Sequence, residues 1–442
     1  MRIYDTLSRA KVDFQPLDPD HVRIYVCGPT VYDYAHIGNA RPVVIFDVLV
    51  RLMRRLFPKV TYVRNITDID DKINARALES GRDIREITEE TAKVYHEDMA
   101  AVGALPPDVE PRATEHVTQM IAMIENLIAK GYAYEAEGHV LFSVPSMADY
   151  GRLSKLDRRE IVAGARVDVA PYKKDAQDFV LWKPSDLEAP GWGSPWGRGR
   201  PGWHIECSAM SYEHLGDKFD IHGGGVDLVF PHHENEIAQS KCALGADAFA
   251  TYWMHNGYLM SEGEKMSKSL GNFYTVHELL EEFPGEAIRL LLLQTHYRQP
   301  LDFTKAGIAE ARRTMDRWHR AADGVDPDSP VAQTVMDALA DDLNTPKAIA
   351  ELHQLSTSDP AGFLASARLM GLFGQSAEDW LKWKPPKSVA GLDDAAIDAL
   401  IKERVQARQN KDFATSDRIR DDLAAQGIVL EDGPAGTTWR SG

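Results

Sequence analysis

Four side chains that commonly bind zinc, Cys27, Cys207, His232 and Glu236, are spread over more than two hundred residues of this chain. Each stands beside a segment predicted to be the end of a strand or the start of a helix. Structural zinc sites usually collect their ligands in short Cys-x-x-Cys knuckles, whereas ligands gathered from separate strand ends place the ion in the crevice of a parallel sheet. The spacing therefore predicts one catalytic Zn²⁺ per chain, at a site that binds a substrate.

His232 and Glu236 are four residues apart on a predicted helix, so both side chains point from one face. His233 is three residues from Glu236 and could take the place of His232, although its own neighbour four residues on, Ile237, cannot bind a metal. The spacing favours His232 and leaves His233 open. Cys242 is turned away from His232 on the same helix, and we predict that it belongs to the core.

Two further segments suit a polyphosphate. His36 and Asn39 precede a helix, whose free backbone N–H groups and dipole favour anions. Lys265 and Lys268 lie in a polar segment, residues 264–272, that is flanked by glycine. Such a loop could close on a ligand and place its lysines against the charge that develops on a leaving pyrophosphate.

The elements that must position these residues follow an α/β pattern. A strand at 23–26, a helix at 43–56 and a strand at 60–64 predict a βαβ unit. The pattern resumes near residue 202 with a strand at 219–222, a glycine loop at 223–225 and a helix opened by Pro231. Between them, residues 132–144 alternate like a hairpin, which indicates an insertion at about 115–202.

The chain divides into four predicted parts. We expect a Rossmann-type catalytic domain at 1–245 and, at 246–305, a signature-loop and stem-contact region that carries the lysine segment. An α-helical domain at 306–384 and a small C-terminal domain at 387–442 should follow. The last part should contain two helices and a short extended tail. The sequence 384–386, Lys-Pro-Pro, is the predicted linker before it.

Composition indicates a soluble cytoplasmic protein. The chain has 442 residues and a net charge of −17, which argues against indiscriminate nucleic-acid binding but not against one RNA held by local basic patches. Three cysteines cannot form a disulfide framework, no signal pattern opens the chain, and the longest apolar run is too short to span a membrane. A basic stripe on a predicted helix could contact phosphates: Arg312, Arg313, Arg317 and Arg320.

The order of the two phosphate-binding segments, HIGN at 36–39 and KMSKS at 265–269, resembles the paired signatures of class I aminoacyl-tRNA synthetases. The four dispersed ligands narrow the resemblance to the cysteinyl-tRNA synthetase family. Further matching segments cover nearly the whole chain: YVCG at 25–28, RNITDIDDK at 64–72, GWHIECS at 202–208, FPHHENE at 230–236, EDGP at 431–434 and TWR at 438–440. One departure is Asn39, where the familiar signature has a second histidine; asparagine keeps a donor and an acceptor but carries no charge.

The resemblance implies that Cys27, Cys207, His232 and Glu236 hold zinc and that the metal takes the thiolate of L-cysteine as an added ligand. It also implies that Thr67, Trp203 and Asp227 surround the amino acid, with Trp203 as a wall and Asp227 as the partner of the ammonium group. Serine matches cysteine in shape, so direct coordination of a soft thiolate would discriminate where a pocket that measures size could not.

The implied reaction has two steps, cysteinyl-adenylate formation from ATP and transfer to the 3′ end of tRNA(Cys). His36, Asn39, Lys265 and Lys268, with Mg²⁺ on the phosphates, would orient the reactants and stabilise charge. The family uses positions matching Arg408, Phe413, Asp417 and Asp432 for the anticodon. The family commonly has tryptophan where this chain has Phe413, so stacking there would be weaker. We expect a monomer that does not contact membranes.

Two other functions fit part of this pattern. The related cysteine ligase of mycothiol synthesis keeps the zinc and both signatures but joins cysteine to an amino-sugar, and that family lacks the anticodon block, here residues 393–442. A non-catalytic RNA-binding relative would be expected to have lost a zinc ligand or a loop lysine, and this chain retains all of them.

Overall fold

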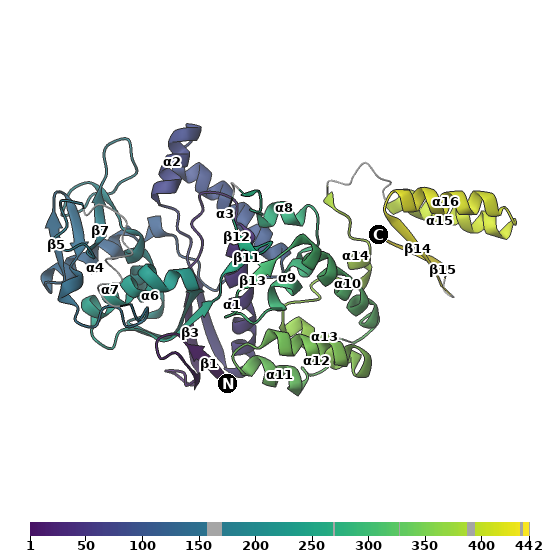
Figure 1. Cartoon of the computed structure of the whole chain (residues 1–442), viewed down its shortest axis with the longest axis horizontal. Helices are drawn as coiled ribbons and strands as arrows, with labels where there is room; N and C mark the ends of the chain where they lie inside the picture. Colours follow the sequence, from purple (N-terminus) through teal and green to yellow (C-terminus); the bar gives the residue numbers. More distant parts are fainter. Residues whose placement is uncertain (157–169, 268–269, 327, 387–393, 434–435, 442) are drawn as a thin grey trace.

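The computed structural model describes residues 1–156, 170–267, 270–326, 328–386, 394–433 and 436–441. The molecule is elongated (Figure 1). A lobe that contains the sheets adjoins a bundle of helices, and the C-terminal pair of helices with its hairpin stands at the far end, beyond that bundle. Among the described residues, no helix is long and apolar enough to cross a bilayer.

The centre of the catalytic half is a four-stranded parallel sheet with the order β10-β9-β3-β4. Its strands are β3 (His21–Val26), β4 (Lys59–Arg64), β9 (Lys218–Gly225) and β10 (Phe249–Asn256). Helix α1 (Ile37–Leu56) connects β3 to β4 and buries Val44, Phe46 and Leu49 completely in the core. The predicted Rossmann-type βαβ unit is confirmed.

The segment between β4 and β9 carries helices and a second sheet. The helices are α2 (Asp71–Ser80), α3 (Ile84–Ala101), η1 (Ala113–Glu115), α4 (Val117–Ala129), η2 (Val144–Ser146) and α6 (Trp203–Leu215). The sheet is antiparallel, with strands β5 (Ala133–Ala136), β6 (His139–Phe142), β7 (Phe179–Pro184) and β8 (Gly199–Pro201). The predicted hairpin is therefore present, and it belongs to this larger sheet.

After β9 the chain forms η3 (Val226–Leu228), a π-helical turn η4 (Val229–His233) and α7 (Glu234–Leu244). Short strands follow, β11 (Leu259–Ser261), β12 (Glu264–Lys265) and β13 (Leu301–Phe303), with β11 parallel to β13. The helices of the second half are α8 (Val276–Leu280), α9 (Gly285–Leu293), α10 (Lys305–Ala321), α11 (Gln333–Ala340), α12 (Thr345–Ser358), α13 (Pro360–Leu369) and α14 (Ala377–Leu381).

One hydrophobic core joins the α1 side of the parallel sheet to the helices from α9 to α14, while a second core lies between the other side and the insertion. The C-terminal block has a small core of its own, which includes Ile397, Leu423 and Trp439. That block contains α15 (Asp394–Gln409), α16 (Phe413–Ala425) and the hairpin of β14 (Ile428–Gly433) with β15 (Gly436–Ser441). The predicted order of two helices and an extended tail is confirmed.

Three local predictions were wrong. The glycines at 223–225 continue β9 instead of forming a loop, because they pair with β10 and Phe46 packs where a Cβ of Gly223 would lie. Pro231 lies in η4 after a cis peptide bond, and α7 begins only at Glu234. Two short, partly exposed strands precede the first predicted one, β1 (Arg2–Asp5) and β2 (Ala10–Asp13).

Candidate active site

A cavity of about 900 Å³ opens where the carboxyl ends of β3, β9 and β10 meet the start of α1. This is the edge of a parallel sheet at which ligands bind. Predicted site residues from distant parts of the sequence line it together: Cys27, His36, Asn39, Trp203 and Asp227. Met266, from the KMSKS segment, lines it as well. The structure thus brings both signatures and one predicted zinc ligand to a single pocket.

The four predicted zinc ligands converge from the residue after β3 and from α6, η4 and α7, with their donor atoms all within 4.8 Å of one another. Cys27 Sγ lies 3.6 Å from Cys207 Sγ and 3.6 Å from Oε1 of Glu236. Oε1 of Glu236 lies 3.0 Å from Nε2 of His232. A tetrahedral ion with zinc–sulfur bonds of about 2.3 Å would separate two thiolates by roughly 3.7 Å, so the pair of sulfurs fits such an ion.

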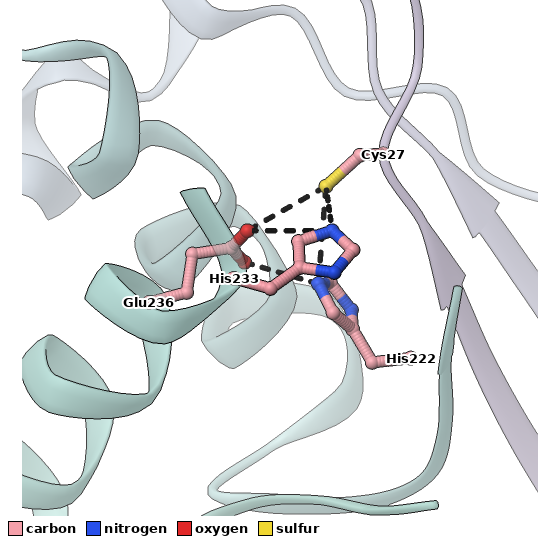
Figure 2. Close-up of side chains that lie close together, drawn as sticks. All are labelled: Cys27, His222, His233 and Glu236. Carbon is pink, nitrogen blue, oxygen red and sulfur yellow. Dashed lines mark hydrogen bonds and ion pairs between the residues drawn. The ribbon is translucent and has the colours of Figure 1, made fainter. Parts of the chain in front are cut away.

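A second possible set of ligands shares Cys27 and Glu236 and replaces the other two by His222 and His233 (Figure 2). Nε2 of His233 lies 3.3 Å from Cys27 Sγ, and Nε2 of His222 lies 3.2 Å from Oε2 of Glu236. Figure 2 shows both rings beside the sulfur and the carboxylate. The alternative that the spacing left open for His233 is therefore physically present, with His222 as an additional partner.

Burial favours the neutral forms of the three histidines, of Cys27 and of Glu236 in this cluster. It lowers the pKa of His222 to about 3, and it lowers the pKa of His232 and His233 well below the ordinary value. Burial also raises the pKa of Cys27 and of Glu236 well above their ordinary values. Neutral imidazoles can bind a metal directly, while a divalent cation would offset the cost of ionising the buried thiols and carboxylate. The donor set therefore fits Zn²⁺.

The histidines of the two sets are held by different neighbours. His232 Nδ1 lies 2.9 Å from Nδ1 of His204, and the ring of Trp203 stacks on His232 with centroids 4.3 Å apart. His233 Nδ1 lies 2.7 Å from Nε2 of His255. Trp203 is 42% exposed and lines the cavity, so the set that contains His232 lies next to this cavity.

The other two predicted cysteine-binding residues have different surroundings. Asp227 is exposed within the lining of the cavity, where a substrate ammonium group could reach it. Thr67 is buried, and its hydroxyl donates to Oε2 of Glu206 over 3.1 Å. Its backbone N–H donates to the carbonyl of Pro29, which lines the cavity. Thr67 thus supports the pocket wall through its backbone, and its contact with cysteine stays a prediction.

The first signature begins α1. The side-chain oxygen of Asn39 accepts a hydrogen bond of 3.1 Å from the backbone N–H of His36, which caps the helix. A Cβ on Gly38 would lie 2.9 Å from the His36 ring, so glycine leaves room for this ring, and Met266 of the second signature lies beside the same position. Asn39 therefore keeps a defined structural role in place of the more usual histidine.

The second signature follows β11. The backbone of Lys265, in β12, pairs with that of Met260, and the Asn272 side chain accepts from Ser267 N–H and donates to the carbonyl of Ser261. These bonds close the base of the loop. Lys268 lies outside the described residues, so its predicted contact with phosphate remains a prediction.

The predicted anticodon residues lie on the C-terminal block. Nη1 of Arg408 lies 2.9 Å from Oδ2 of Asp432, and Arg404 also binds that carboxylate through both Nη atoms. Asp417 pairs with Arg420 at 3.1 Å, and Phe413 is 62% exposed at the start of α16. Asp432 thus orients two arginines, while the Phe413 ring is available for stacking.

One arginine of the predicted basic stripe on α10 contacts the C-terminal block, and two others contact residues outside it. Nη2 of Arg320 lies 3.2 Å from Oε1 of Glu431, and the guanidinium of Arg312 lies over the ring of Trp383. Nη2 of Arg317 donates to Thr314 over 2.9 Å. A contact of the stripe with RNA phosphates stays a prediction.

Comparison with known proteins adds an independent line of evidence. Residues 13–313 match the family model described as the class I (C) tRNA synthetase catalytic domain, and residues 392–440 match the anticodon-binding domain of cysteinyl-tRNA ligases. Residues 334–358 match a DALR domain. The chain is 62% identical to a cysteine–tRNA ligase of Rhodospirillum rubrum, over 100% of this chain and 99% of that protein. The chain belongs to the cysteine–tRNA ligase family.

A second relative, from Paramagnetospirillum magneticum, is 60% identical over 100% of this chain and 99% of its own length. Solved structures resemble the fold at low identity. One is a methionyl-tRNA synthetase of Mycobacterium tuberculosis in complex with methionyl-adenylate (TM-score 0.56, 13% identity, 84% of this chain and 92% of that one). Another is a leucyl-tRNA synthetase of Agrobacterium radiobacter K84 (TM-score 0.55, 13% identity, 83% and 86%). The class I fold predicted from the signatures is confirmed for this member of the cysteine–tRNA ligase family.

Sequence reasoning missed the histidines around the cluster, His204, His222 and His255. His222 and His255 are buried and His204 is partly exposed, and each touches another histidine or Glu236. A signal was available, since His204 lies in the motif of Cys207, and His222 and His255 lie near the carboxyl ends of adjacent parallel strands.

Proposed function

We propose that this chain joins L-cysteine to tRNA(Cys) in two ATP-dependent steps, at the cavity between the zinc cluster and the two signatures. The observation that supports this most directly is the shared lining: Cys27 and Trp203, of the candidate zinc site, line a single pocket together with His36, Asn39 and Met266 of the two signatures. A bound amino acid would thus face a nucleotide across the pocket.

We propose Cys27, Cys207, His232 and Glu236 as the ligands of one Zn²⁺. The bound ion would supply a direct bond to the substrate thiolate, which a hydroxyl cannot match near neutral pH. The two protein thiols and the stacking of Trp203 on His232 favour this set over the set of His222 and His233, because the first set lies beside the cavity. Selection of cysteine over serine would then need no second, editing site.

The protein side of the reaction is orientation and charge stabilisation. The substrate carboxylate attacks the α-phosphorus of ATP, and pyrophosphate leaves. His36 and Asn39 at the N-terminus of α1, with Lys265 and Lys268 of the loop, hold the phosphates together with Mg²⁺. Asp227 holds the ammonium group of cysteine, and Trp203 and Thr67 shape its side of the pocket. We propose no covalent link between substrate and enzyme.

We propose that the C-terminal block reads the anticodon, with Arg408 contacting a base, Phe413 stacking on one, and Asp417 and Asp432 accepting hydrogen bonds or orienting the arginines. The block has its own small core, and a match to an anticodon-binding domain covers it. We also propose that the enzyme is cytoplasmic and monomeric.

Two assays test the proposal together. In the presence of ATP and labelled pyrophosphate, cysteine should support exchange of label into ATP, and serine should support far less. Labelled cysteine should then appear in total tRNA. Exchange without tRNA charging, accompanied by consumption of an amino-sugar acceptor, would replace this function by the cysteine ligase of mycothiol synthesis. The C-terminal block argues against that outcome, because the alternative family lacks it.

A further inference from the structure

Arg41 is an internal cation whose partners are all backbone carbonyls. Its side chain is 0% exposed. Nη1 donates to the carbonyls of Gly257 and Tyr258 over 2.7 and 2.6 Å. Nη2 lies 2.6 Å from the carbonyl oxygen of Gln299, and 3.4 and 3.3 Å from those of His296 and Tyr297. Among the described residues, no carboxylate forms an ion pair with it.

These carbonyls come from two segments that run side by side. The backbone N–H of Gly257 donates to Tyr297, and that of Leu301 donates to Tyr258, before β11 and β13 continue as parallel partners. A Cβ on Gly257 would lie 2.7 Å from two carbonyl oxygens of the other segment, so only glycine allows this approach. The aligned carbonyl dipoles point at one place, and a cation there offsets their mutual repulsion.

Asp342 fixes the second segment through the side chains of Tyr297 and Arg298. This buried carboxylate accepts from the Tyr297 hydroxyl over 2.7 Å and from Nε and Nη2 of Arg298 over 2.9 and 2.7 Å. Asp342 also accepts from the backbone N–H of Tyr4. Residues 296–299 are therefore held in place by Asp342, and the hydrogen bonds of Arg41 connect residues 257–258 to them.

Arg41 also stands on the helix that begins with the first signature. It lies five residues after His36, on α1, and lines the same cavity. The residues that it holds precede β11, which leads directly into the second signature. Residues 256–260 line the cavity with His36 and Asn39.

We infer that Arg41 is a positioning residue for ATP, which locks the cavity wall at residues 256–260 against α1 and so sets the distance between the two signatures. It does not touch the reacting atoms. Burial lowers the pKa of Arg41 to about 10, so the side chain stays charged near neutral pH. A lysine would keep the charge but could not bind all five of these carbonyls, since it has only three donors and they share one nitrogen.

The inference rests on the proposed function, and Arg41→Lys tests it in cysteine-dependent ATP–pyrophosphate exchange. We expect the KM for ATP to rise by roughly tenfold, as the loss of one to two net hydrogen bonds predicts, and the KM for cysteine to change by less than about twofold. Hydrogen exchange of the free protein should also quicken at amides within residues 257–262, because this wall is no longer held.

Arg289→Lys is the matched control. Arg289 is equally buried and donates to the carbonyls of Met370 and Val102 and to Asp47, away from the cavity. Its replacement should lower the stability and leave the KM for ATP unchanged. Equal KM values for ATP in the wild type and Arg41→Lys, or equal rises in both KM values, would overturn the inference. If the wild type shows no exchange with cysteine, the proposed function fails, while hydrogen exchange still reports whether Arg41 holds the wall.

Discussion

The two possible zinc sites can be separated by the ligands that they do not share. Cys207 and His232 belong only to one set, and His222 and His233 only to the other. We expect Cys207→Ser and His232→Gln each to remove a direct zinc ligand. We expect His233→Gln to remove only an outer partner, because Nε2 of His233, 3.3 Å from the Cys27 sulfur, would contact that ligand and not the metal.

The expected magnitudes follow from this difference. Loss of an outer-shell partner typically costs about 10–100-fold in metal affinity, and loss of a direct ligand should exceed the upper end of that range. His233→Gln should therefore weaken zinc binding by less than about 100-fold, or about 2.7 kcal/mol, and His232→Gln by more.

Competition with a chromogenic chelator measures the zinc affinity of each variant. Cobalt substitution provides a second measurement, because thiolate-to-cobalt charge-transfer absorption should fall by about half in Cys207→Ser, which leaves one of two thiolates. ATP affinity, measured in parallel, is the control for folding and should be unchanged. Larger losses of zinc affinity in His222→Gln and His233→Gln than in Cys207→Ser and His232→Gln would refute the reasoning. Such a result would assign the metal to the set that contains His222 and His233.

Three further predictions address other parts of the molecule. Lys268→Ala should slow cysteinyl-adenylate formation more than it weakens ATP binding, because loop closure acts on charge that grows in the transition state; single-turnover release of pyrophosphate measures this, and an unchanged rate would contradict it. A chain that ends at Pro386 should still bind zinc and form cysteinyl-adenylate but lose most tRNA charging, since the C-terminal block has a separate core. In the full chain, Arg408→Ala should cost about 1–3 kcal/mol in charging and alter the preference among anticodon variants. Equal charging by the truncated and full chains would exclude the anticodon assignment. Burial raises the pKa of Asp98 to about 6, so the stability that its protonated form contributes is present below about pH 4 and is lost as the pH rises through 6. In urea unfolding, the free energy of unfolding of the wild type should fall by about 2 kcal/mol between pH 4 and 7 relative to that of Asp98→Asn. The same pH dependence in both proteins would contradict this.

Much of the site could be predicted from the sequence because its residue types carry their chemistry with them. Thiols, imidazole and carboxylate at the ends of predicted strands and helices indicated a zinc site, and lysines in a glycine-flanked loop indicated phosphate. The βαβ unit followed from apolar periodicity and turn residues. The C-terminal block was predicted as two helices and a tail, which local patterns are sufficient to specify.

The tertiary structure decided what local patterns cannot encode. Gly223 to Gly225 read as a loop, yet pairing with β10 and the packing of Phe46 make them strand. His222 had no predicted role, and it acquires a possible metal role only because parallel strands place it beside Cys27. Arg41 carried no signal either, because its partners are backbone carbonyls, and every residue has one. Sequence determines which chemistry is available, whereas long-range packing determines which groups meet, since contacts between distant segments depend on the whole fold.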